Sequence, residues 1–312
     1  SSKLTPILEK FFSIDVHIRE YPRPDFDCRQ YLERLLRADT PQHLVRLVVR
    51  PAALPPNLAR FSSENPLNYA SVGSKDSGVS LVTKEPVLDA IKATPIGGCL
   101  VLVGLGGSGK TTALTMAASG IAESAITDVA LPLPIILKLS NYQGSLETLV
   151  HKSISLLYGD YRSIPAKFLL LCDGLDEIPD GRAQDFLIEL GQLLDLDRFA
   201  AVITLRTSGL RRPASFDRIK LVLAIEPLSI RQIIEVAERN IEPAHRAKFL
   251  EEIRRFDRGL DRTALLLLPF GLATALRVFK ETNAVPNNSS ALIDTLLKLR
   301  MDRNRQADRP IA

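Results

Sequence analysis

A glycine-rich stretch at residues 104–112 has the residue types needed to bind a phosphate. It reads GLGGSGKTT and fits the pattern G-x-x-x-x-G-K-[ST]. Glycines let the backbone curl around an anion with no Cβ in the way, and the loop amides then point at the phosphate. We expect the lysine to reach the β- and γ-phosphates and the first threonine to ligate Mg²⁺. The predicted nucleotide contacts in this loop are Gly104, Gly106, Gly107, Ser108, Gly109, Lys110, Thr111 and Thr112.

A second group of polar side chains follows an apolar run at 168–172, in the sequence DGLDE at 173–177. At the tip of a strand, Asp173 would hold Mg²⁺ through water, because this ion keeps most of its hydration shell. Asp176 or Glu177 would orient or deprotonate the attacking water. Three carboxylates in five residues repel one another, so a bound cation is the economical explanation. The alternative is a solvated acidic loop, which is disfavoured beside the glycine-rich loop.

A third candidate, Arg206, follows the apolar run at 201–205. A guanidinium at a strand tip can sense the γ-phosphate, since its fork of donors matches phosphate oxygens. The alternative is an ion pair between Arg206 and a nearby carboxylate when no nucleotide is bound. Both interpretations hold if the pairing switches with the nucleotide. The predicted catalytic residues are Lys110, Asp176, Glu177 and Arg206, and the predicted metal ligands are Thr111 and Asp173.

These side chains must be positioned by a domain in which strands and helices alternate. Continuous apolar runs are typical of parallel strands that are buried on both faces. We therefore predict an α/β fold, a five-stranded parallel sheet sandwiched by helices, which together with the glycine-rich loop resembles the P-loop sheets of the AAA+/ASCE type. The predicted strands are 99–103, 134–139, 168–172, 201–205 and 220–225. The predicted helices are 110–123, 145–158 and 182–194.

The pattern changes after Pro227, where only helical segments follow, at 230–240, 243–256, 263–268, 271–282 and 291–305. We predict three units along the chain. Residues 1–80 form an N-terminal extension or a small helical adaptor or effector module, with a helix at 26–38 and a linker at 71–80; packing as an extension is favoured. Residues 81–226 form the nucleotide-binding α/β domain. Residues 227–312 form an all-helical lid.

Composition excludes some classes of protein. The chain has 312 residues with 40 basic and 36 acidic side chains, so no global charge favours nucleic acid or a membrane surface. No apolar run reaches the roughly 18 residues that span a bilayer. Basic pairs such as Arg211–Arg212 and Arg254–Arg255 are interpreted as solvated surfaces, because no aromatic residues interleave with them; nucleic acid is not indicated. Three scattered cysteines suit a reducing compartment, and we expect a cytoplasmic protein.

Together these motifs resemble the NACHT branch of the STAND signalling NTPases. The resemblance rests on 104–112, on the strand 131–139, on 173–177 and on 202–206, in that order, and covers about 81–305. The helical part is also similar, at 226–229 and 265–272. The resemblance implies ATP and ADP as ligands, with Mg²⁺, and it implies that Pro269 packs beside the adenine. Family members usually carry a winged-helix domain and then a long repeat sensor, and the sequence leaves open whether this chain is a fragment of such a longer protein.

The resemblance also implies a function. The chain would be an ADP/ATP molecular switch that oligomerises on ATP binding for signalling, in innate immune or antiviral defence, with slow ATP hydrolysis to ADP and phosphate. Its partners would be other copies of itself, a trigger ligand and an effector, neither of which the sequence identifies. The alternative from another class is a motor-type AAA+ ATPase that acts on nucleic acid or protein by rapid turnover. A third interpretation is a scaffold that binds nucleotide only structurally.

Overall fold

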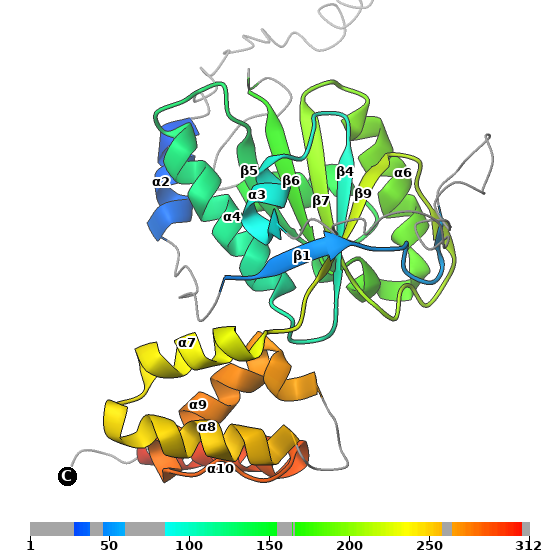
Figure 1. Ribbon diagram of the computed structural model, residues 1–312. Coiled ribbons are helices and arrows are strands. Elements are labelled where there is room, and N and C mark those ends of the chain that lie inside the picture. The colour runs from blue at the N-terminus through cyan, green and yellow to red at the C-terminus, as the bar shows by residue number, and fades with distance from the viewer. Residues whose placement is uncertain are drawn as a thin grey trace, which may run out of the picture.

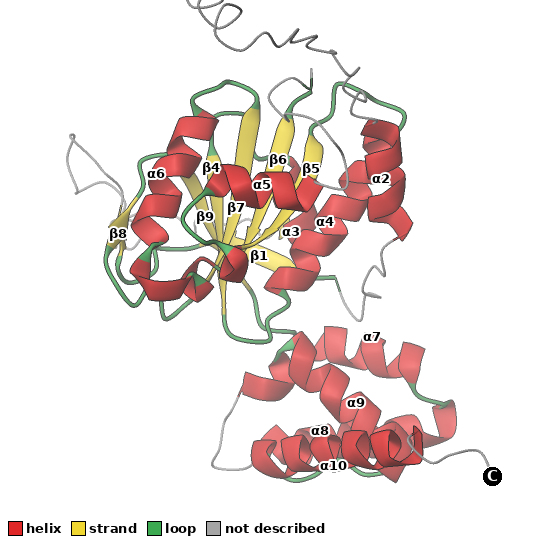
Figure 2. Cartoon of the chain, turned by 180° about the vertical axis from the view of Figure 1, so that it is seen from behind, coloured by secondary structure: helices red, strands yellow, loops and turns green. Residues whose placement is uncertain are grey.

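The computed structural model describes residues 28–37, 46–59, 85–154, 164, 166–257 and 264–307. A twisted β-sheet with helices on both faces forms one part of the molecule, and a group of helices near the C-terminus forms the other (Figures 1 and 2). The predicted linker at 71–80 and the last residues of the predicted helix 145–158 lie outside the described residues. Within the described part, no helix combines the length and the apolarity needed to cross a membrane.

The sheet has seven strands rather than the five expected, in the order β3-β1-β9-β4-β7-β6-β5. The five predicted strands are all present and run parallel to one another. They are β4 (Cys99–Gly104), β5 (Leu133–Lys138), β6 (Phe168–Asp173), β7 (Phe199–Arg206) and β9 (Ile219–Ile225). The two additional strands are β1 (Val48–Pro51) and β3 (Glu85–Pro86); β1 is antiparallel to both β9 and β3. They escaped prediction because both are short and contain proline, which disfavours interior strands.

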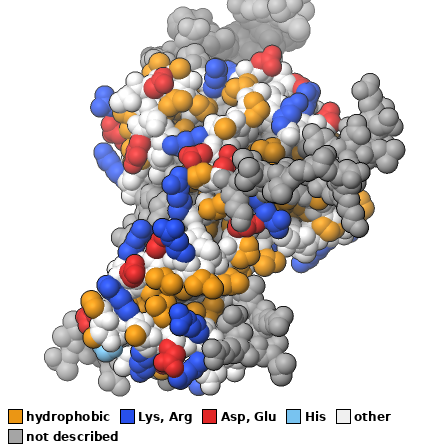
Figure 3. Space-filling view, viewed as in Figure 1, with side chains coloured by type: hydrophobic (Ala, Val, Ile, Leu, Met, Phe, Trp, Pro, Cys, Tyr) orange, Lys and Arg blue, Asp and Glu red, His pale blue; other side chains and the backbone are white. Residues whose placement is uncertain are grey.

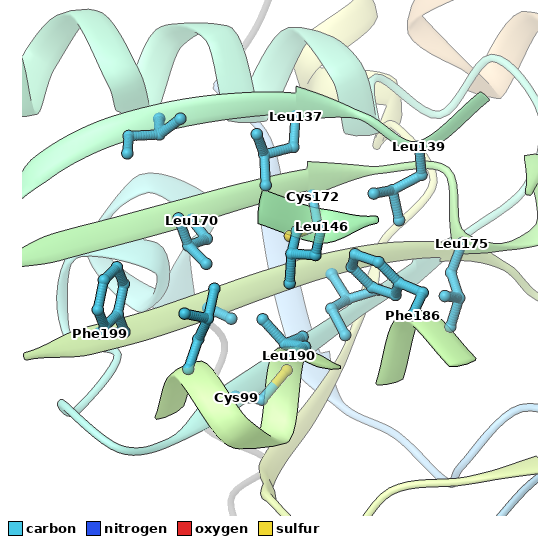
Figure 4. Close-up of a cluster of buried hydrophobic side chains, with 14 of the residues drawn as sticks. Cys99, Leu137, Leu139, Leu146, Leu170, Cys172, Leu175, Phe186, Leu190 and Phe199 are labelled. Atoms are coloured by element: carbon cyan, nitrogen blue, oxygen red, sulfur yellow. The ribbon is translucent and has the colours of Figure 1, made fainter. Parts of the chain in front are cut away.

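Alternate residues of the parallel strands enter two different cores. On one face, α5 (Leu146–Ile154) and α6 (Ala183–Leu194) pack on side chains such as Cys99, Leu170 and Phe199 (Figure 4). On the other face, α3 (Val87–Lys92) and α4 (Lys110–Ala125) pack on side chains such as Leu100 and Leu171. Burial on both faces is the reason that these strands consist of unbroken apolar residues.

The C-terminal helices continue the second core. They are α7 (Ile230–Asn240), α8 (Pro243–Asp257), the 3₁₀ helix η5 (Ala264–Leu267), α9 (Pro269–Thr282) and α10 (Ser289–Ala307). Ser229 and Gln232 form a capping box that fixes the start of α7. In the space-filling view, apolar side chains gather over these helices, beneath the sheet (Figure 3). Their inner faces share one apolar cluster with α3 and α4.

Two stretches that precede residue 81 pack against the sheet. Helix α2 (Cys28–Arg37) lies beside α4, and the Tyr31 hydroxyl donates to the carbonyl of Pro134 in β5 at 2.7 Å. Residues 46–59, which we call the N-terminal strap, contain β1 and the short β2 (Leu58–Ala59), which pairs with β8 (Ala214–Ser215). The strap also reaches the start of α7, because Gln232 Nε2 donates to the Arg46 carbonyl at 2.8 Å. These contacts favour a packing extension for this part of the chain, whereas the boundary at residue 81 stays a prediction.

Candidate nucleotide-binding site

The glycine-rich loop connects β4 to α4, as predicted. Gly107 and Gly109 adopt φ values of +78° and +93°, which residues with a Cβ rarely adopt. Gly109 caps α4 without any side-chain hydrogen bond to the first turn. The amides of that turn are therefore directed at the space in front of the loop, where the helix favours an anion.

Lys110 lies across the loop. Its Nζ donates to the carbonyls of Gly104 and Leu105, at 2.8 and 2.9 Å. Partial burial lowers the pKa of this ammonium below its ordinary value, and the nearby Asp176 opposes that shift. A phosphate would replace the two carbonyls with stronger, charge-assisted hydrogen bonds.

Asp173, at the end of β6, is held by two threonine hydroxyls. Thr111 Oγ1 donates to Oδ2 at 2.7 Å, and Thr204 Oγ1 donates to Oδ1 at 2.8 Å. Thr204 also accepts the N–H of Gly174, at 2.7 Å. It can do so because β7 lies between β4 and β6. Sequence analysis missed Thr204, whose only signal is a hydroxyl within an apolar run.

The donor set around Asp173 fits Mg²⁺. A carboxylate and the Thr111 hydroxyl are hard oxygen donors, and this ion is usually held by one or two protein groups together with phosphates and water. Among the described residues no group of three or more His, Cys, Asp or Glu side chains could hold a metal. The protein would thus contribute Thr111 and Asp173, and the phosphates and water would complete the coordination.

Asp176 and Glu177 lie in η3 (Leu175–Glu177), a 3₁₀ turn that begins after Gly174 at φ +82°. Arg206 pairs with both acids. Its Nε is 3.1 Å from Asp176 Oδ2, and its Nη2 is 3.4 Å from Glu177 Oε1. The Arg206 backbone N–H also donates to Asp176, at 3.2 Å. The repulsion among the carboxylates is therefore offset by a guanidinium and two hydroxyls, so it no longer argues for a metal by itself.

A cavity of about 810 Å³ lies in front of the loop, within the size range of ligand sites. Eleven of the thirteen predicted site residues line it; the exceptions are Gly104 and Ser108, whose buried hydroxyl lies against Gly104. The cavity also has apolar lining residues. They are Leu47 from the strap, Val87 and Leu88 from α3, Met116 from α4 and Pro269 from α9, and the charged residues Arg46, Asp89 and Arg239 line the cavity with them. The cavity therefore offers both charged groups, which suit phosphates, and apolar surface, which suits a flat base.

The first turn of α9 lies directly on the phosphate loop. The Phe270 N–H donates to the Gly107 carbonyl at 3.2 Å. A Cβ built on Gly107 would be 2.9 Å from the Phe270 Cβ, and one built on Gly109 would be 3.7 Å from Pro269 Cγ. Pro269 is thus brought to the cavity, while Phe270, which sequence analysis did not identify, makes the closest contact. Nothing in the local sequence marks Phe270, because only the packing of α9 brings it to the loop.

Comparison with known proteins identifies one family. Residues 99–244 match the NACHT domain family. No curated protein sequence matches the chain.

Solved structures with a similar fold include C. elegans PCH-2, which is 12% identical with a TM-score of 0.42 and is matched over 70% of this chain and 65% of that one. The Aeropyrum pernix ORC1 protein in complex with DNA is 14% identical, with a TM-score of 0.40 over 69% and 63%. The ORC2 protein of the same organism is 13% identical, with a TM-score of 0.41 over 68% and 66%. This chain therefore spans slightly less than two thirds of each of these structures.

Proposed function

This chain contains a NACHT domain, a nucleotide-binding P-loop NTPase domain, at residues 99–244, and we propose that it acts as an ADP/ATP switch. With ADP bound, the helical part at 227–312 stays closed on the α/β part at 81–226. Exchange for ATP opens the molecule, and open copies assemble. The observation that carries this proposal is the contact between α9 and the phosphate loop, through the Phe270 N–H and the Gly107 carbonyl.

The pairing of Arg206 with Asp176 and Glu177 supports slow hydrolysis. The acids accept a proton only after Arg206 has turned toward the γ-phosphate. An attacking water then forms a bond to the γ-phosphorus and gives its proton to Glu177 or Asp176, while the bond to the β-phosphate oxygen breaks. Mg²⁺, when it is bound by Thr111 and Asp173, offsets the phosphate charge.

The energies of a few contacts suffice for the switch. Shifting a population from 1:99 to 99:1 takes about 5.5 kcal/mol of differential binding. Hydrogen bonds to charged groups contribute about 1.5–3 kcal/mol each. Lys110 and Arg206, together with a metal that Asp173 would hold, are enough groups to supply that difference when the γ-phosphate is present.

The size of the protein in solution tests the proposal. We expect a monomer with ADP and a larger assembly with a non-hydrolysable ATP analogue, measured by light scattering coupled to gel filtration. Lys110→Ala should abolish nucleotide binding and remain monomeric, and Glu177→Ala should retain ATP and assemble. Rapid turnover stimulated by nucleic acid would instead support a motor, and retained nucleotide with no change in size would support a scaffold.

The biological role is proposed on the resemblance to signalling NTPases. The assembly would act in innate immune or antiviral signalling in the cytoplasm, with a trigger ligand upstream and an effector downstream. The described residues 28–37 and 46–59 pack on the sheet. This packing supports a role in sensing the nucleotide state rather than a role as an independent effector.

A further inference from the structure

A second cavity, of about 690 Å³, adjoins the nucleotide cavity. Asp176, Glu177 and Arg206 line both cavities, so these three side chains form the wall between them. The rest of the second cavity is formed by the segment 178–183 and by the loop 208–212 that follows β7.

The lining of this second cavity contains three arginines and two carboxylates, and the carboxylates, Asp176 and Glu177, are both paired with Arg206. Arg211 and Arg212 are exposed, and neither forms an ion pair with a carboxylate whose side chain the structure describes. Arg212 lies on the bare backbone of Gly181, where a Cβ would be 2.6 Å from the Arg212 Cδ. With Arg206 on the shared wall, three arginines line one cavity. Planar forks of donors of this kind match the oxygens of a phosphate.

The loop that carries these arginines is held by the N-terminal strap. The Leu210 N–H donates to the Pro56 carbonyl at 3.1 Å, and Asn57 Nδ2 donates to the Leu210 carbonyl at 2.8 Å. At Gly209, where φ is +75°, a Cβ would lie 2.0 Å from the Pro56 oxygen. The loop is thus fixed before any ligand arrives, which reduces the entropic cost of binding.

We propose that the second cavity binds the inorganic phosphate formed by hydrolysis and is its route out of the protein. This inference rests on the proposed function. After cleavage, ADP would occupy the phosphate loop. The freed phosphate would lie beside Glu177 and Arg206, and both of these residues also line the second cavity. No covalent bond changes in this step, because a hydrogen phosphate already formed moves from one set of guanidinium donors to the next.

Equilibrium dialysis with radiolabelled inorganic phosphate tests the site, on the full chain with and without ADP. We expect the double variant Arg211→Ala/Arg212→Ala to bind phosphate roughly 10- to 100-fold more weakly than the wild type, with unchanged ADP affinity. The matched control is Arg254→Ala/Arg255→Ala, which removes two arginines from α8 and should leave phosphate binding unchanged. Arg211→Lys/Arg212→Lys, which keeps the charge, should recover part of the affinity.

A second variant separates the site from a folding defect. Asn57→Gly keeps a residue that tolerates the positive φ of 63° at this position but removes the amide that holds the loop. We expect a smaller loss of phosphate affinity with normal ADP binding. In a single turnover of ATP, the arginine double variant should cleave at the wild-type rate and release phosphate more slowly, as measured with a fluorescent phosphate sensor.

The outcomes distinguish the two proposals. If the wild type binds no ADP, the proposed function fails, and phosphate binding to the nucleotide-free chain still tests this site. If ADP binds but the wild type and the arginine double variant bind phosphate equally, only the present inference is overturned. It is also overturned if the arginine variants lose activity only at concentrations at which the wild type assembles, because the arginines would then act on a second copy.

Discussion

At the scale of single residues, the Thr204 hydroxyl connects the end of β6 to the turn that follows it. It donates to the Asp173 carboxylate and accepts the Gly174 amide N–H. Thr204→Val conserves the volume but leaves a buried amide and one carboxylate oxygen without these partners. We expect a loss of about 1–3 kcal/mol in the free energy of unfolding and weaker Mg²⁺-dependent nucleotide binding. Urea denaturation and a nucleotide titration measure the two effects. Thr295→Val, which removes a hydroxyl bonded within α10, is the control, and equal losses in both variants would contradict the assignment.

Also at the scale of single residues, we expect the protonation of Lys110 to make ATP affinity depend on pH. Its pKa in the folded chain lies below the ordinary 10.5, chiefly because the ammonium is desolvated. Burial of the charged ammonium lowers the free energy of unfolding. This penalty is present in full below the lowered pKa and disappears as the pH rises from that pKa to 10.5. Nucleotide binding needs the charged form and therefore weakens over the same pH range, below 10.5. We expect ATP affinity to fall with rising pH in the wild type and to be flat in Lys110→Arg, as measured by calorimetry; parallel curves would refute this role.

At the scale of elements, we expect alanine substitutions at two helical glycines to have opposite effects on the stability of the protein. A Cβ at Gly271, in the first turn of α9, would lie 1.9 Å from the Leu265 carbonyl oxygen, whereas at Gly120 in α4 the nearest atom is 3.7 Å away. We expect Gly271→Ala to destabilise the protein by about 1–3 kcal/mol. Gly120→Ala should stabilise it by roughly 0.5–1 kcal/mol, because alanine loses less backbone entropy. Thermal unfolding compares the two variants. Similar shifts in Tm would contradict the prediction and would show that η5 moves away to make room for the added Cβ on α9.

The five parallel strands were predictable because burial on both faces makes each of them a continuous apolar run. β1 was not, since its identity depends on pairing with a distant partner, Val49 with Ile225, and not on its own four residues. The site follows the same rule. The residues at 104–112 and 173–177 are contiguous and carry recognisable patterns, whereas Thr204 and Phe270 enter the site only through the order of the strands and the packing of α9.

At the scale of the whole molecule, we expect the contact between Phe270 and the phosphate loop to limit the rate of nucleotide exchange. Two of its ring carbons would lie 3.5 and 3.6 Å from a Cβ built on Gly107, and the residue is 51% exposed. Phe270→Ala keeps the backbone hydrogen bond and removes the ring, so the closed form loses on the order of 1 kcal/mol and ADP leaves roughly fivefold faster. Stopped-flow release of a fluorescent ADP measures the rate. Val129→Ala, at a side chain 93% exposed, is the control, and unchanged release would separate α9 from nucleotide exchange.

The N-terminal strap has a consequence for recombinant fragments of this protein. Its strand β1 covers the edge of β9, and its Leu47 lines the nucleotide cavity. A fragment that begins at the predicted boundary, residue 81, would leave unpaired backbone groups along β9, which is a template for aggregation. The same fragment would lose Asn57 and with it the support of the loop that carries Arg211 and Arg212. The smallest fragment suited to biochemical study therefore begins before Arg46.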